Sequence, residues 1–222
     1  MANFLDKVQP KNKAQLKRLI DYAFKHNIYD LNFIDTSKIT DMSNLFMNCE
    51  YDIDVSNWDV SNVTTTFCMF VGCKKFNSDL SNWDVSNVKN MNNMFYCCKN
   101  FDCDLSNWNV SNVTDMYSMF TACESFEGKG LDNWDVSKAE DMRFMFYNCK
   151  NFNCDLSNWD MSKALRINEM FYGCKNFEGK GLENWKLEKT LFYYDIFTGC
   201  DKVKLPSWYK AFLKRCNLEF FK

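Results

Sequence analysis

The side chains with the greatest potential for chemistry in this 222-residue chain are its twelve cysteines. Seven of them end a Phe-x-x-Cys motif that returns every 24 to 26 residues. These motif cysteines are Cys49, Cys73, Cys98, Cys123, Cys149, Cys174 and Cys200. Regularly spaced thiols could bind a metal, form disulfides or respond to redox conditions.

Zinc binding needs four ligands around one point. Cys98 and Cys103 form one local pair, and Cys149 and Cys154 form another, each with four residues between them. Zinc prefers tighter knuckles with two more ligands close by, and the single histidine, His26, lies in the predicted N-terminal cap. A regular column of thiols also does not converge on a point, so the spacing argues against zinc.

Disulfides between neighbouring repeats are a second alternative, because equivalent residues in stacked repeats would lie about 5 Å apart. Seven equivalent cysteines would leave one unpaired, and the pairing would be ambiguous. We therefore predict that the motif cysteines are free thiols that pack as small apolar residues. No metal or other cofactor is expected, and a thiol-based metal-binding or redox-responsive protein is the alternative function.

Carboxylates form a weaker series. Asp59, Asp84, Asp135 and Asp160 each follow a tryptophan, and stacked carboxylates could bind calcium between repeats. Asp, Asn and Ser in such a context more often hydrogen-bond the backbone of a tight bend, which is the interpretation favoured here. The chain has one histidine and shows no Gly-rich phosphate loop and no Ser-x-x-Lys pair, so we predict no catalytic residues and no enzyme activity.

These residues belong to an internal sequence repeat, and the repeat must determine where they lie. Tryptophans recur in phase with the cysteine motif, at Trp58, Trp83, Trp108, Trp134, Trp159, Trp185 and Trp208. With the motif cysteines, the first six of them form a predicted structural ladder. The apolar steps within one unit predict a short extended segment near Trp83, a bend, and a short helix or 3-10 turn over 91–98. Such a unit cannot bury its apolar face alone, so the repeats should stack into a solenoid.

The repeat resembles a known family. Residues 83–107 read WDVSNVKNMNNMFYCCKNFDCDLSN, and this pattern is similar to the BspA-like bacterial surface protein repeat, an offshoot of the leucine-rich repeats. The resemblance covers roughly residues 9–200. It implies an α/β repeat fold, a right-handed leucine-rich-repeat-like solenoid of about seven coils, and a role at a cell surface or in host contact.

The ends of the chain read as caps. Asn12 with Gln15 predicts a capped helix start, and Trp208, Phe212 and Leu213 are expected to face inward from a closing helix. The predicted organisation is an N-terminal helical cap over 1–31, the repeats over 32–200, and a C-terminal cap over 201–222.

The charge is uneven along the chain. Residues 1–31 hold six Lys/Arg and three acids, and residues 201–222 hold six and two, which leaves 15 against 24 in the middle. This acidic body argues against nucleic-acid binding. The start has no signal-peptide pattern and no window is long enough for a membrane span, which predicts a cytoplasmic protein. A surface or secreted location is the alternative that the resemblance implies.

Positions that vary inside a strict repeat are released from the core. Several carry aromatic residues, and exposed aromatics suit a partner surface. The candidate partner-binding residues are Tyr96, Tyr117, Phe144, Tyr147 and Tyr172. The alternative is that these rings lie half-buried between repeats. We predict a non-catalytic scaffold that binds another protein, whose identity the sequence does not give; nor does it give the oligomeric state.

Overall fold

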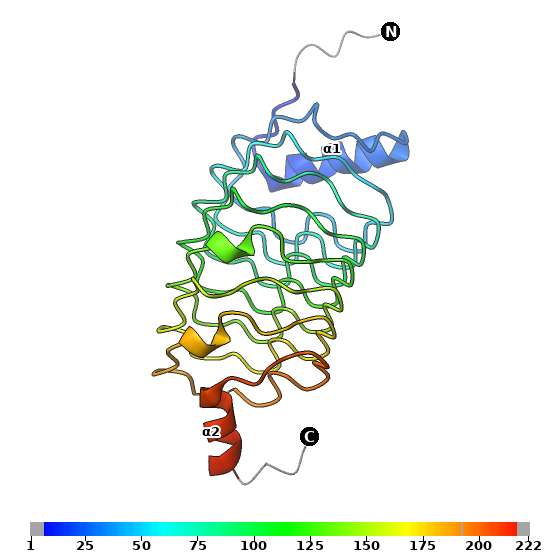
Figure 1. Cartoon of the computed structure of the whole chain (residues 1–222). Helices are drawn as coiled ribbons and strands as arrows, with labels where there is room; N and C mark the ends of the chain where they lie inside the picture. The colour runs from blue at the N-terminus through cyan, green and yellow to red at the C-terminus, as the bar shows by residue number, and fades with distance from the viewer. Residues whose placement is uncertain (1–6, 192, 217–222) are drawn as a thin grey trace.

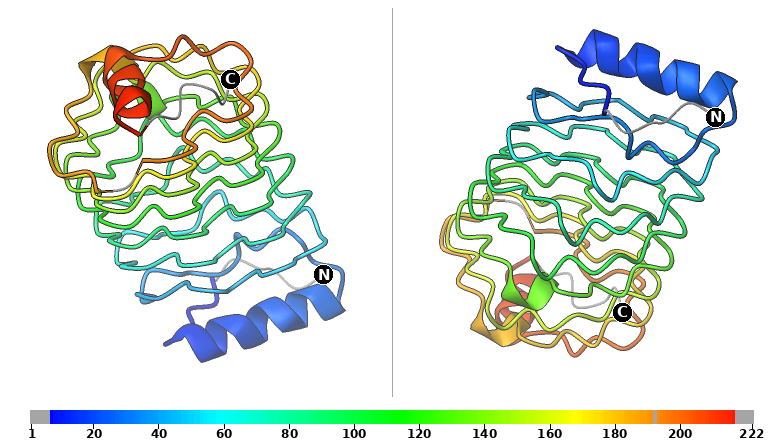
Figure 2. Two further views of the ribbon diagram at one scale, coloured as in Figure 1. Left: turned by 90° about the horizontal axis from the view of Figure 1, so that it is seen from below. Right: turned by 90° about the horizontal axis from the view of Figure 1, so that it is seen from above.

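The computed structural model describes residues 7–191 and 193–216. Four short helical elements occur there: α1 (Lys13–Lys25), the 3-10 turns η1 (Leu131–Asn133) and η2 (Leu182–Asn184), and α2 (Ser207–Arg215). Between α1 and α2 the repeats lie one upon another, as Figures 1 and 2 show. We call each repeat a layer and number the layers one to seven by their motif phenylalanines, Phe46, Phe70, Phe95, Phe120, Phe146, Phe171 and Phe197.

The predicted fold class, an α/β right-handed leucine-rich-repeat-like solenoid, is wrong. In the described part of the chain there is no strand and no sheet, and most residues lie in turns or irregular structure. From layer one to layer six, neighbouring layers meet through isolated parallel bridges at equivalent positions, for example Asn90 with Asp115 and Asp115 with Asp141. The stack is therefore built from turns and lacks the strands that a leucine-rich repeat needs.

The backbone between Met91 and Cys98 explains why the expected short helix or 3-10 turn is absent. Asn93 and Cys97 both have left-handed φ values, 55° and 61°. Two consecutive four-residue turns result, closed by Met94 N–H to Met91 O (3.1 Å) and by Cys98 N–H to Phe95 O (2.9 Å). A positive φ at the third residue of such a turn is typical of type II. The 3- and 4-residue apolar spacing that looks helical is the spacing of these two turns.

The remaining amides of these turns link the layers. Asn93, Phe95 and Cys97 donate their N–H groups to carbonyls of the next layer, at 2.8, 2.9 and 2.7 Å. Alternate residues thus bond within the layer and across it. The backbone groups are satisfied without a strand, which buried polar groups require.

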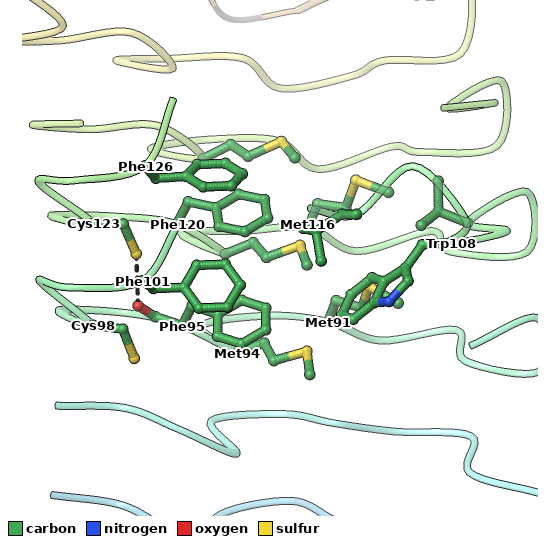
Figure 3. Close-up of a cluster of buried hydrophobic side chains, with 14 of the residues drawn as sticks. Met91, Met94, Phe95, Cys98, Phe101, Trp108, Met116, Phe120, Cys123 and Phe126 are labelled. Atoms are coloured by element: carbon green, nitrogen blue, oxygen red, sulfur yellow. Dashed lines mark hydrogen bonds between the residues drawn. The ribbon is translucent and has the colours of Figure 1, made fainter. Parts of the chain in front are cut away.

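The core is a set of side-chain columns that run from layer to layer, and Figure 3 shows part of them in layers three and four. The rings of Phe95 and Phe120 stack at 5.6 Å, and those of Trp83 and Trp108 stack at 6.5 Å. Phe101 adds a second phenylalanine column against Phe95, at 4.0 Å. Since each ring is covered by the layers on both sides, burial stabilises the stack and cannot stabilise one layer alone.

The helix α1 lies across the N-terminal end of the stack (Figure 1). Asn12 caps it by accepting the Gln15 N–H at 3.0 Å, while the Gln15 side chain accepts the Lys11 N–H at 2.8 Å. The predicted capped start is thus confirmed. Leu16, Ile20 and Ala23 are buried.

The helix α2 begins after Pro206 at the other end. Trp208 continues the tryptophan column against Trp185 at 6.3 Å, and Tyr209 meets the Phe197 ring edge-on at 5.0 Å. Tyr209 is the buried residue of α2, whereas the predicted inward residues Trp208, Phe212 and Leu213 are partly buried against the core. Residues 1–6 and 217–222 of the predicted caps lie outside the described residues.

Candidate functional site

The motif cysteines form a hydrogen-bond ladder inside the stack. Six of the seven thiols donate to the carbonyl of the motif phenylalanine in the preceding layer, at 2.8 to 3.0 Å. Figure 3 shows Cys123 with the Phe95 carbonyl. All twelve cysteines of the chain lie within the described residues, and all are free thiols. A cysteine here fills a small apolar site and also supplies a donor, which alanine or valine could not do.

Burial keeps most of these thiols protonated. It raises the pKa of Cys98, Cys123, Cys149 and Cys174 well above the ordinary value, and that of Cys200 to about 12. The thiolate is the form that binds metals and attacks electrophiles. Cys98, Cys123, Cys149, Cys174 and Cys200 are therefore poorly suited to either reaction near neutral pH. Cys73 is the exception, because a hydrogen bond with the Cys98 side chain lowers its pKa.

The two local cysteine pairs have divergent surroundings. Cys98 donates to Phe70 O at 2.9 Å, whereas the Cys103 sulfur accepts the Leu80 N–H at 3.2 Å. Burial raises the pKa of Cys154 to about 12. Among residues 7–191 and 193–216, no group of three or more His, Cys, Asp or Glu side chains gathers as metal ligands would.

The tryptophans form a second hydrogen-bond ladder. Sequence reasoning placed the first six of them in a structural ladder but did not foresee these hydrogen bonds. Each indole N–H donates to a backbone carbonyl in the preceding layer, at 2.7 to 3.3 Å. The acceptor is a leucine in every layer except one, where Val55 takes that place. The strict recurrence of tryptophan, and not of phenylalanine, was the available signal, since only the indole carries a donor.

The carboxylates that follow the tryptophans close turns. Asp59, Asp84, Asp135 and Asp160 each accept the backbone N–H of the serine two residues later, at 2.9 to 3.0 Å. The prediction of turn chemistry is confirmed for these four. Hydrogen bonds from the serine hydroxyl or backbone lower the pKa of Asp84, Asp135 and Asp160, so these groups are carboxylates at neutral pH.

Four of the five candidate partner-binding residues make one continuous aromatic group. The rings of Tyr117 and Phe144 meet at 5.6 Å, those of Phe144 and Tyr147 at 5.9 Å, and those of Tyr147 and Tyr172 stack at 4.8 Å. These four side chains are half-buried, whereas Tyr96 is 37% exposed. We call these five residues the aromatic surface. The aromatic surface has features of both the partner-binding and the half-buried alternatives, since its rings pack between layers and still expose part of their area to solvent.

Phe144 has an unusual backbone. Its φ is +58°, and the equivalent residues of the other layers, which also have positive φ, are Asn44, Cys68, Asn93, Ser118, Glu169 and Asp195. Asparagine tolerates this conformation well, but a bulky side chain there is uncommon and locally unfavourable. Phe144 thus places a phenyl ring at the surface at a position where the turn favours a small polar residue.

Charged residues border the aromatic surface. The Arg143 guanidinium lies 5.0 Å from the centre of the Tyr117 ring and makes a two-point hydrogen bond with Asp141, at 2.9 and 2.7 Å. Arg166 bonds the same carboxylate at 3.1 Å. Asn168 is only 3% exposed, and its Oδ1 has no hydrogen-bond donor in the described part of the chain. Asp141 and Arg166 escaped prediction because they come together only across two layers.

These features define a repeat protein of stacked turns with aromatic side chains on one surface. Residues 14–131 and 103–208 match the family described as "Mycoplasma protein of unknown function, DUF285", and the chain belongs to that family. The two matches overlap over 103–131, as expected when one family unit spans several repeats. No curated protein and no solved structure matches the chain. The helices of the described residues are too short and polar to cross a bilayer.

Proposed function

We propose that the protein is a non-catalytic scaffold that binds another protein through the aromatic surface. The observation that carries the proposal is Phe144, because a phenyl ring in a left-handed backbone position is a local cost that the fold itself does not require. The other layers place smaller or polar residues there. Contact with a partner best accounts for a phenyl ring at such a position.

The chemistry of the aromatic surface suits protein recognition. Tyrosine and arginine are enriched among the residues that dominate interfaces, because both offer a large contact area together with hydrogen-bond donors. Arg143 already lies on Tyr117, and the contact between Tyr147 and Tyr172 orders both rings before binding. Preordered side chains lose less entropy on association.

The resemblance to the BspA-like surface repeat extends this proposal to the partner, which would be a protein of a cell surface or of a host. The division into caps and repeats at residues 31 and 200 also stays a proposal. The thiol-based alternative is less well supported, because Cys98, Cys123, Cys149 and Cys174 are buried hydrogen-bond donors with a raised pKa.

The proposal is tested by affinity capture with a triple variant, Tyr96→Ala, Tyr147→Ala and Tyr172→Ala. We expect the captured partner to be lost while the circular dichroism spectrum and the melting temperature stay near those of the native protein. Tyr22→Ala, which removes an exposed tyrosine from α1, is the matched control and should retain the partner. Equal capture by the triple variant and the control would place the binding site elsewhere.

A further inference from the structure

The last layer ends in backbone donors that have no acceptor among the described residues. In layer six, Glu169, Phe171 and Gly173 donate their N–H groups to Tyr194, Ile196 and Thr198 of layer seven, at 3.2, 3.1 and 2.8 Å. The equivalent donors of layer seven belong to Asp195, Phe197 and Gly199. Within the described residues, none of these three N–H groups has a hydrogen-bond acceptor. We call them the donor edge.

The opposite end of the stack is closed by lysines. The Lys13 ammonium bonds the Asp41 carboxylate at 3.1 Å and the Ser43 hydroxyl at 2.5 Å. The Lys17 ammonium reaches the Leu45 carbonyl at 3.4 Å. These groups stand where a preceding layer would supply its N–H donors, and Lys17 satisfies one first-layer carbonyl, that of Leu45.

The helix α2 does not close the donor edge in the same way. It packs its aromatic residues over Trp185 and Phe197, and Figure 2 (left) shows it above one side of the last layer. On the remaining part of the layer, Leu191 is 70% exposed and Tyr194 is 49% exposed. Exposed apolar side chains beside unpaired backbone donors are typical of a surface that accepts another chain.

We propose that the donor edge binds an acidic segment of another protein, which presents backbone carbonyls of alternate residues to Asp195, Phe197 and Gly199. The edge itself, residues 193–200, carries one charged side chain, Asp195. Charge still favours an acidic segment, because residues 202–215, the loop and helix beside the edge, carry five Lys/Arg and no acid. The inference concerns a second surface and does not depend on the aromatic surface.

A second copy of the chain does not fit this edge. Two donor edges cannot hydrogen-bond each other, and the matching acceptor edge of another copy lies beneath α1. The occupant must therefore be a different protein whose carbonyls are free.

A suitable probe is the synthetic peptide TDMYSMFTACESF, residues 114–126 of this chain, with blocked ends and Cys123 replaced by serine. Within the stack, this segment presents the Tyr117, Met119 and Thr121 carbonyls to layer three, and it carries two acids and no base. Added to the full chain at about 1 mM, it should slow amide exchange of Asp195 and Gly199 by about tenfold or more. A scrambled peptide of equal composition should not.

Variants of the full chain sharpen the test. Leu191→Glu adds a negative charge and removes apolar contact at an exposed position, so it should weaken peptide binding by about tenfold, whereas Tyr22→Glu at the opposite end should not. Three results would each overturn the proposal. They are unchanged exchange at Asp195 and Gly199, equal effects of the scrambled peptide, and self-association of the native chain that Leu191→Glu abolishes.

Discussion

The positions that repeat and the positions that vary differ in what they contribute to the molecule. Cys123 and Trp108 lie in columns of equivalent side chains. Each of the two packs against the neighbouring layer and donates a hydrogen bond to a backbone carbonyl of the preceding layer. Phe144 lies in a column whose other members are small or polar, and its backbone conformation is locally unfavourable. The repeated interior is explained by stability, so function should be sought where one layer departs from the others.

Alkaline pH should give the largest effect on the interior. Burial raises the pKa of Cys98, Cys123, Cys149 and Cys174 above the ordinary value of 9.0. Above pH 9 the unfolded chain therefore releases protons that the folded chain retains, and stability present below pH 9 is lost as the pH rises. We expect a loss of about 1.4 kcal/mol per thiol for each further pH unit.

Urea unfolding between pH 8 and pH 10.5 measures this loss. Cys123→Ala should reduce the pH dependence, whereas Cys216→Ser, at an exposed position, should leave it unchanged. A free energy of unfolding that does not fall over this range would show that the buried thiols do not remain protonated in the folded chain.

Removing a shared ring should give the next largest effect. Phe120→Ala leaves a cavity between layers three and five, because Phe120 stacks on Phe95 and on Phe146. We expect the free energy of unfolding to fall by about 3–5 kcal/mol. Phe67→Ala, at an exposed phenylalanine, is the control and should cost less than about 1 kcal/mol.

Removing one donor of the thiol ladder should cost less. Cys123→Ala leaves the Phe95 carbonyl without its thiol donor, which should lower the free energy of unfolding by about 1–3 kcal/mol at pH 7. Cys123→Ser can still donate to that carbonyl, so it should be the less damaging change. The reverse order of the two variants would argue that the thiol is retained for its apolar character alone.

The sequence was sufficient to predict the stacked repeat but not the backbone conformation within each layer. The in-phase recurrence of Trp83, Trp108 and Cys98, Cys123 reveals a stack, because each unit is too small to be stable alone. Turns escaped prediction because their left-handed residues include Cys97, Ser118 and Phe144, none of which is glycine. Apolar spacing reports which side chains are buried and cannot distinguish a helix from two successive turns.

The candidate site was only partly predictable for a related reason. Tyr117, Phe144, Tyr147 and Tyr172 could be selected because they vary inside a strict pattern. Their mutual contacts depend on which positions of adjacent layers face each other. The same holds for Asp141 between Arg143 and Arg166, where two layers contribute to one cluster.

The most direct test of the central claim is Phe144→Asn, which restores the residue type of Asn44 and Asn93. Relief of the left-handed cost should roughly offset the lost ring contacts, so the free energy of unfolding should stay within about 1 kcal/mol of the native value. Partner capture should fall by about tenfold or more. A loss of stability above about 2 kcal/mol with capture unchanged would show that Phe144 serves the fold, and would contradict the account.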